Sequence, residues 1–306
     1  MRHVATRPGL RVRPRILAVG TLALALALLA PLVGAWLSSD NDPGRAADRA
    51  TVTPRSPVGV TQQRAGRSPQ AAAPLAAPSP VITPGGRVHV VGLGDSVPAG
   101  SACDCTSYVD LVGRTWASGM GGSAEVSNLA FPGLTTGGLL QQLDIPLVRT
   151  AVARADLLIV TIGANDFDVS QVTSDSCAPE ANLGCYRPAL ALLRTDLVEV
   201  LARLHALQGD RHGVIVLTGY WNVFRDGQVG QAQGTTYLRA SRALTQEANT
   251  VISQVAGDGG ARYADLHQAF QDSSEDWTDL LAPDGDHPSA AGHQLIAQAV
   301  LAALRA

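Results

Sequence analysis

Short apolar runs alternate with helical repeats through the C-terminal part of the chain. Residues 88–93, 156–162 and 213–217 are rich in Val, Ile and Leu with little polar alternation, which is typical of strands buried on both faces. Two more polar segments, 124–130 and 261–266, predict weaker strands. The pattern therefore predicts five strands with helical segments between them.

The clearest helical repeat covers residues 188–206. Its leucines recur every three or four residues and share one face, while the charged side chains fall elsewhere. Pro188 suits the first turn of such a helix, where a missing amide hydrogen costs nothing. Similar patterns predict further helices over 108–118, 235–255 and 289–304.

Strands that alternate with helices predict one doubly wound, flavodoxin-like α/β domain with a five-stranded parallel sheet over residues 85–306. In such sheets ligands bind beyond the carboxyl ends of the strands. The loops that follow the strands are therefore the places to look for chemistry.

A membrane-targeting pattern precedes this domain. Residues 1–15 contain five arginines and no acid, and an apolar run follows over 16–37. The run is long enough for a transmembrane signal anchor, but Pro31 and the small residues at 33–35 equally suit a cleaved signal peptide. Both alternatives place the rest of the chain outside the cytoplasm, either secreted or anchored to the cell membrane by the N-terminal helix.

Residues 38–84 have the composition of a linker. The segment has no aromatic residue, holds eight of the 18 prolines and is otherwise rich in Ala, Ser, Arg and Gln. Such a segment buries too little apolar surface to offset the entropy lost on ordering. We therefore expect a disordered tether between residues 1–37 and the domain.

Charge is distributed unevenly along the chain. The 23 basic residues are all arginine, and ten of them lie in residues 1–84 against only three acids. The remaining 13 face 23 acids in residues 85–306, which makes the predicted domain acidic. This balance disfavours a nucleic-acid-binding domain. We expect a monomer that meets the membrane only through the N-terminal segment, if that segment stays uncleaved.

The four cysteines agree with export. Cys103, Cys105, Cys177 and Cys185 are even in number and all lie in the predicted domain, which favours two disulfides. Pairing of Cys177 with Cys185 would close a short loop and is the favoured connectivity. A Cys103–Cys105 pair would need a bent backbone between the two residues, so cross-pairing stays open. A four-cysteine zinc site is the rival interpretation.

Three strand-end loops carry polar or flexible residues. The first strand runs into Gly94-Asp95-Ser96, where a serine can expose its hydroxyl. The second runs into Pro132-Gly133, and the third into Gly163-Ala164-Asn165-Asp166, whose asparagine can direct an amide into a cleft. Each loop alone also suits an ordinary helix cap, an Asx-turn or a Pro-Gly turn.

A fourth loop adds a base and its partner. In Asp284-Gly285-Asp286-His287 the first carboxylate stands three residues before the imidazole, so it can accept from one ring nitrogen while the other faces the cleft. A solvated acidic loop or a metal cluster that includes Asp286 is the alternative. No second histidine stands at ligand spacing, because His293 belongs to the following helix, so we expect no metal.

Together these four loops resemble the SGNH hydrolases, also called the GDSL family of esterases and lipases. Gly94-Asp95-Ser96 matches the first block, Gly133 the second, Gly163 to Asp166 the third, and Asp284 with His287 the last. Val97 replaces the leucine of the motif, at a position where the family is tolerant.

The resemblance implies a nucleophile, Ser96, a general base and acid, His287, and an orienting carboxylate, Asp284. It also implies an oxyanion hole formed by the Ser96 amide, the Gly133 amide and the Asn165 side chain, with no cofactor. Asp95 and Asp166 are interpreted as residues that hold the loops.

The expected function is extracytoplasmic hydrolysis of carboxylic esters through an acyl-serine intermediate, on small-molecule, lipid or polysaccharide esters. The alternatives are an O-acyltransferase or carbohydrate deacetylase acting on cell-surface polymers, and a non-catalytic surface binding module. Tyr220 and the two residues after it are either pocket lining or packed aromatics. The same question is open for Phe131, Phe167 and Trp277.

Overall fold

The computed structural model describes residues 86–306. The predicted targeting segment, 1–37, and linker, 38–84, lie outside the described residues. Within the described part of the chain, no helix is both long and apolar enough to cross a membrane.

The centre of the domain is a parallel sheet with the strand order β2-β1-β3-β4-β5. This is the order of a flavodoxin-like sheet, and it confirms the predicted fold class. Each predicted strand overlaps an observed one, with ends that differ by a few residues. The strands are β1 (Arg87–Gly94), β2 (Ser123–Asn128), β3 (Leu157–Thr161), β4 (Val214–Thr218) and β5 (Arg262–Ala264).

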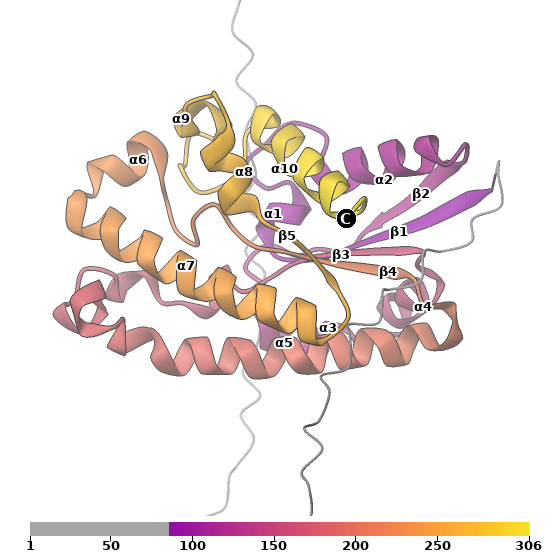
Figure 1. Ribbon diagram of the computed structural model, residues 1–306, viewed down its shortest axis with the longest axis horizontal. Helices are drawn as coiled ribbons and strands as arrows, with labels where there is room; N and C mark the ends of the chain where they lie inside the picture. The colour runs from indigo at the N-terminus through magenta and orange to yellow at the C-terminus, as the bar shows by residue number, and fades with distance from the viewer. Residues whose placement is uncertain (1–85) are drawn as a thin grey trace, which may run out of the picture. The chain divides into compact units, whose positions relative to one another are not determined.

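Helices cover both faces of the sheet (Figure 1). α2 and α10 pack together on one face, and α3, α4, α5 and α7 pack on the other. The four predicted helices correspond to α2, α5, α7 and α10. The α-helices are α1 (Ser96–Ala99), α2 (Tyr108–Gly119), α3 (Thr136–Gln142), α4 (Pro146–Arg154), α5 (Arg187–Gln208), α6 (Gly227–Ala232), α7 (Thr235–Asp258), α8 (Leu266–Asp272), α9 (Trp277–Leu280) and α10 (Ala290–Ala303).

The core lies between the sheet and these two helical layers. Every residue of β3 and β4 is buried, as expected for central strands covered on both sides. On α5 the buried face includes Leu193, Leu197, Leu201 and Leu204, which are part of the predicted apolar stripe. These rigid central elements hold the strand-end loops in place.

The long connection between β3 and α5 contains only short 3₁₀ turns. They are η1 (Ala164–Asp166), η2 (Val169–Gln171), η3 (Asp175–Cys177), η4 (Pro179–Ala181) and η5 (Gly184–Tyr186), while η6 (Gly209–Arg211) follows α5. Tyr186 is buried in this connection, and its hydroxyl donates to the Asp168 carbonyl at 2.9 Å. The connection is therefore packed although it has no long helix.

All four cysteines form local disulfides. Cys177 pairs with Cys185 across the β3–α5 connection, and Cys103 pairs with Cys105 in the loop between α1 and α2. These pairings differ from the cross-pairing that the sequence left open. The structure also lacks the four-thiolate zinc site, because no free cysteine is left among residues 86–306.

Candidate active site

The strand-end loops meet around one cavity of about 440 Å³. Ser96 reaches it from the end of β1, Asn165 from the end of β3, Tyr220 from the end of β4 and His287 from the loop before α10. Residues far apart in sequence thus share one site because parallel strands end at the same edge of the sheet.

Ser96 opens the short helix α1. The carboxylate of Asp95 caps this helix by accepting from the Val97 amide at 3.0 Å. Ser96 is the first residue of α1, so its own amide has no partner within the helix and is free to donate toward the cavity. Its side chain is partly exposed, as a nucleophile must be.

Gly94 makes this sharp turn possible. Its φ is +128°, and a Cβ at this position would lie 1.8 Å from the carbonyl oxygen of Thr161 on β3. The close approach lets the Asp95 amide donate to that same oxygen at 3.1 Å. No residue with a side chain fits here without moving the turn that presents Ser96.

The paired carboxylate and imidazole expected in the last loop lie in contact. Asp284 Oδ2 is 2.7 Å from His287 Nδ1, while Asp284 Oδ1 accepts from the amides of Asp286 and His287 at 2.9 and 3.0 Å. Burial acts to raise the pKa of Asp284, but the hydrogen bonds from His287 and Asp286 outweigh it and hold that pKa below its ordinary value. Asp284 therefore stays ionised and fixes the imidazole ring with Nε2 free.

The rest of the chain holds this loop from both sides. The Ala282 amide donates to the His287 carbonyl at 2.7 Å, which closes the loop on itself. The Asp226 amide donates to the Gly285 carbonyl at 2.8 Å and ties the loop to the segment after β4. The imidazole is thus positioned by backbone contacts as well as by Asp284.

Asn165 and Gly133 belong to neighbouring loops. The Asn165 side-chain amide donates one hydrogen to the Leu134 carbonyl at 3.0 Å, so its second hydrogen is available to a ligand. Gly133 has a φ of +79°, and its amide makes no hydrogen bond within residues 86–306. Gly133 lies outside the residues that line the cavity itself.

Asp166 holds these two loops together, which is the role expected for it from the sequence. Its carboxylate accepts from the Thr136 hydroxyl at 2.6 Å and from the Thr136 amide, at the start of α3. Burial raises the pKa of Asp166 above its ordinary value, although the hydrogen bonds from Thr136 act to lower it. The contact fixes the turn that contains Gly133 relative to Asn165.

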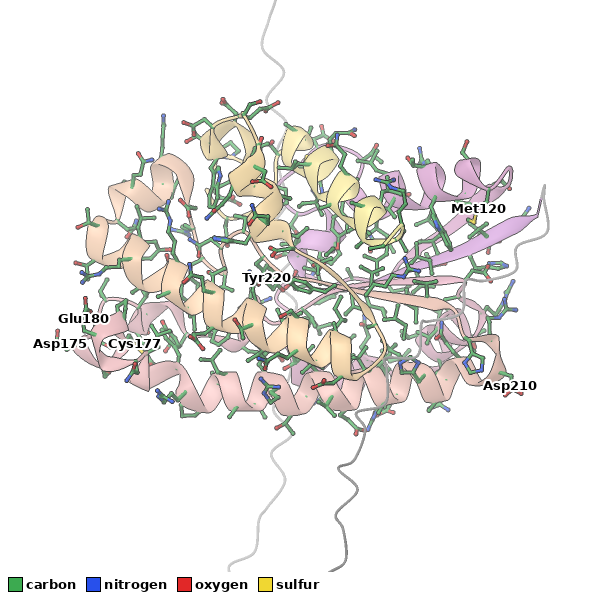
Figure 2. The ribbon with its side chains drawn as sticks, in the orientation of Figure 1. Met120, Asp175, Cys177, Glu180, Asp210 and Tyr220 are labelled. Atoms are coloured by element: carbon green, nitrogen blue, oxygen red, sulfur yellow. A yellow bond between two sulfur atoms is a disulfide. The ribbon has the colours of Figure 1, made fainter. Side chains whose placement is uncertain are left out.

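Asp95 is a buried carboxyl group beneath the site. The Tyr220 hydroxyl donates to it, and the same hydroxyl accepts from the Ala164 amide at 3.3 Å. Burial raises the pKa of Asp95 to about 7, although the hydrogen bonds from Tyr220 and Val97 lower it. Tyr220 lies near the middle of the domain (Figure 2).

Comparison with known proteins agrees with this geometry. A model of the GDSL-like lipase/acylhydrolase family matches residues 93–295, well over half of the chain. The chain belongs to this family. It is therefore a GDSL-type hydrolase of carboxylic esters.

Solved structures share the fold of this GDSL hydrolase. The lipase Lip_vut3 from a goat rumen metagenome is 17% identical, with a TM-score of 0.57 and coverage of 71% of this chain and 97% of that one. A catalytic mutant of Axe2, an acetylxylan esterase from Geobacillus stearothermophilus, is 21% identical, with a TM-score of 0.50 and coverage of 73% and 95%. The chain has no match among curated proteins.

The cavity of this GDSL hydrolase has an apolar wall that the sequence identified only in part. Phe167, Tyr220 and Trp221 line it, and Phe131 and Trp277 do not. Phe131 is 64% exposed, while Trp277 packs edge-on against Phe270. Several further lining residues had no motif to reveal them, because they come from the segments between the predicted elements: Val169, Val172, Thr173, Val223, Phe224, Arg225 and Gln233. Tyr237, in the first turn of α7, lines the cavity as well.

Ser96 and His287 line the cavity together, but no hydrogen bond joins the Ser96 hydroxyl to the imidazole in the part of the chain that the structure describes. Contacts of this kind often tighten only when substrate binds. The arrangement supplies a hydroxyl, a positioned base and amide donors around one space.

Proposed function

We propose that this GDSL hydrolase is an extracytoplasmic serine esterase that works through an acyl-serine intermediate. Ser96 attacks the ester carbonyl while His287 takes its proton, and the resulting imidazolium returns the proton to the departing alcohol oxygen. Water then attacks the acyl-serine with His287 again as the base. The carboxylic acid leaves and Ser96 regains its proton.

In this mechanism Asp284 stabilises the imidazolium and keeps the hydrogen on Nδ1. The amides of Ser96 and Gly133 and the Asn165 side chain donate to the oxyanion of each tetrahedral intermediate. Such donors act because they are already oriented where negative charge develops. The first two donors come from turns held by Asp95 and Asp166, as described above.

One observation carries the proposal. Asp284 holds His287 at 2.7 Å in a loop that faces the same cavity as Ser96, with Nε2 left free. Two backbone amides also donate to Asp284, so its carboxylate is held in a fixed position, which is not expected of a carboxylate in a solvated acidic loop. The geometry favours a functional base over that alternative.

The lining of the cavity favours an acyl group with an apolar chain. Phe167, Val172, Trp221 and Phe224 contribute aromatic and aliphatic surface next to Ser96. A volume of about 440 Å³ lies at the lower end of the usual range of ligand pockets. We infer that short and medium chains fit better than long ones.

Two features of the chain support the proposed extracytoplasmic location. The basic and apolar N-terminal pattern, 1–37, is typical of targeting to a membrane, and four paired cysteines suit an oxidising compartment.

Hydrolysis of p-nitrophenyl esters from acetate to palmitate by the purified, oxidised protein tests the activity, with Ser96→Ala alongside. We expect turnover that falls with chain length and disappears in the variant. Adding a sugar alcohol to the same assay measures acyl transfer. Dominant transfer would favour the O-acyltransferase, and folded protein without any ester turnover would favour the binding module.

A further inference from the structure

The two disulfides differ in exposure. Cys103 and Cys105 are both partly exposed, with the exposed residue Asp104 between them. Cys177 is completely buried at the end of η3 (Figure 2), whereas its partner Cys185 is partly exposed. A thiol in solution therefore has access to both cysteines of the first pair, but to only one cysteine of the second, Cys185.

The two disulfides also close loops of different length. The sequence separation is two residues for Cys103–Cys105 and eight for Cys177–Cys185. A disulfide stabilises a fold less when the loop that it closes is shorter, because it removes less freedom from the unfolded chain. The Cys103–Cys105 bond is therefore expected to stabilise the fold less than the Cys177–Cys185 bond does.

His293 lies directly beside the Cys103–Cys105 pair. It is completely buried on α10, and one of its ring nitrogens and the two sulfur atoms all lie within 4.8 Å of one another. Its Nδ1 accepts from the Tyr108 amide at 3.2 Å. Its Nε2 has no hydrogen-bond partner in the described part of the chain.

These contacts define which nitrogen carries the hydrogen. Burial, with a smaller contribution from His287, lowers the pKa of His293 to about 4, so the ring is neutral near pH 7. Because Nδ1 accepts, the single hydrogen is on Nε2. His293 is therefore a buried donor without an acceptor, which is costly to leave unpaired. A protonated Nε2 is unsuited to bind a metal, which argues against a metal site here.

A second feature favours a thiolate at the same place. Cys105 stands two residues before Ser107, the N-cap of the twelve-residue helix α2. The amides at a helix N-terminus favour nearby negative charge and lower the pKa of a cysteine. The N-terminus of α2 thus follows Cys105 closely in the sequence, and His293 lies within 4.8 Å of both sulfur atoms.

We propose that Cys103 and Cys105 form a redox-active site that exchanges electrons with an external dithiol, and that His293 stabilises the reduced form. A thiolate of the dithiol attacks one exposed sulfur, which forms a mixed disulfide and releases the other cysteine as a thiolate. The second thiol of the reagent then loses its proton and attacks the reagent's sulfur in the mixed disulfide, which breaks the bond to the attacked cysteine and releases that cysteine as a thiolate. Two electrons pass to the protein, the dithiol becomes a disulfide, and the Nε2 hydrogen gains a sulfur acceptor.

The test equilibrates the full chain with mixtures of reduced and oxidised dithiothreitol, alkylates free thiols and locates the label by mass spectrometry. We expect Cys103 and Cys105 to be labelled at a dithiol-to-disulfide ratio at least about tenfold lower than Cys177 and Cys185, with the fold retained in near-UV circular dichroism. Labelling of Cys177 and Cys185 first, or of all four only on unfolding, would overturn the proposal.

Two variants separate the role of His293 from simple packing. His293→Gln keeps an acceptor for the Tyr108 amide and a donor for sulfur, so its midpoint should match the wild type. His293→Leu keeps volume and loses the donor, so about tenfold more reduced dithiol should be needed. Equal midpoints in all three folded proteins would contradict the role of the histidine. The label does not depend on ester turnover, so this result and that of the esterase test are independent.

Discussion

The Tyr220 hydroxyl donates a hydrogen bond to the buried carboxyl group of Asp95, the residue before Ser96. The same oxygen accepts from the Ala164 amide, one residue before Asn165. A single phenol from the end of β4 therefore connects the loop of the proposed nucleophile with the loop of a proposed oxyanion donor. This connection between the two loops therefore depends on a residue that belongs to neither of them.

Tyr220→Phe should loosen both loops. The change leaves the Asp95 carboxyl group and the Ala164 amide without this partner, and we expect a loss of roughly 1–3 kcal/mol in the free energy of unfolding. Ester turnover should fall as well, because the alignment of Ser96 with Asn165 depends on the contact. Urea unfolding and steady-state kinetics measure the two effects. Tyr263→Phe is the matched control, since the Tyr263 hydroxyl makes no hydrogen bond within residues 86–306. Equal stability of the two variants would contradict the connecting role.

The charge of Asp95 should make stability depend on pH. Burial raises its pKa to about 7 in the folded protein, whereas an aspartate in the unfolded chain has a pKa near 3.8. Between these values the folded state keeps a proton that the unfolded state has lost. The contribution of Asp95 to the free energy of unfolding therefore falls as pH rises from about 4 to about 7, and it is constant above that range.

Asp95→Asn should remove this dependence. From pH 5 to pH 8 we expect the variant to gain about 2 kcal/mol relative to the wild type. Urea unfolding of both proteins at the two pH values provides the comparison. Differences in unfolding free energy that stay constant with pH would show that Asp95 does not titrate in this window.

Asp284→Asn tests the orientation of the base. The amide group would place a donor against His287 Nδ1, so the ring hydrogen would move to Nε2 and the base could not accept the Ser96 proton. We expect kcat to fall by roughly 10²- to 10⁴-fold while the protein stays folded. Asp286→Asn is the control, because it removes a nearby negative charge and leaves the 2.7 Å contact intact. Similar losses in both variants would assign the effect to charge instead of orientation.

The features that the sequence predicts well are those that depend on residues close together in the chain. β3 and β4 were recognisable because strands buried on both faces need continuous apolar residues, and α5 because its leucines repeat along one face. The contact between Asp284 and His287 was recognisable because three residues separate them.

Other features depend on contacts between distant residues. The hydrogen bond from Tyr220 to Asp95 joins residues 125 positions apart, and no sequence pattern predicts a contact over that separation. Short helices such as α3 and α6 lack a repeat long enough to detect, and α3 contains two glycines. Val172 and Phe224 line the same cavity as Ser96 although both are far from it in the sequence.

Asn165→Ala should lower kcat by roughly 10²- to 10³-fold with little change in KM, because the lost amide hydrogen would serve the oxyanion and not the bound ester. The interpretation needs a control, since the same side chain also donates to the Leu134 carbonyl at 3.0 Å and helps to hold the turn that contains Gly133.

Thr136→Val supplies that control. It removes the 2.6 Å hydrogen bond from the Thr136 hydroxyl to Asp166, which holds the same turn from outside the cavity. If Asn165 acts only by holding the turn, the two variants should lose similar amounts of turnover. If it donates to the oxyanion, the loss in Asn165→Ala should exceed that in Thr136→Val by at least about tenfold. A raised KM with unchanged kcat in Asn165→Ala would exclude the oxyanion role, because uniform binding and not transition-state stabilisation would then have been lost.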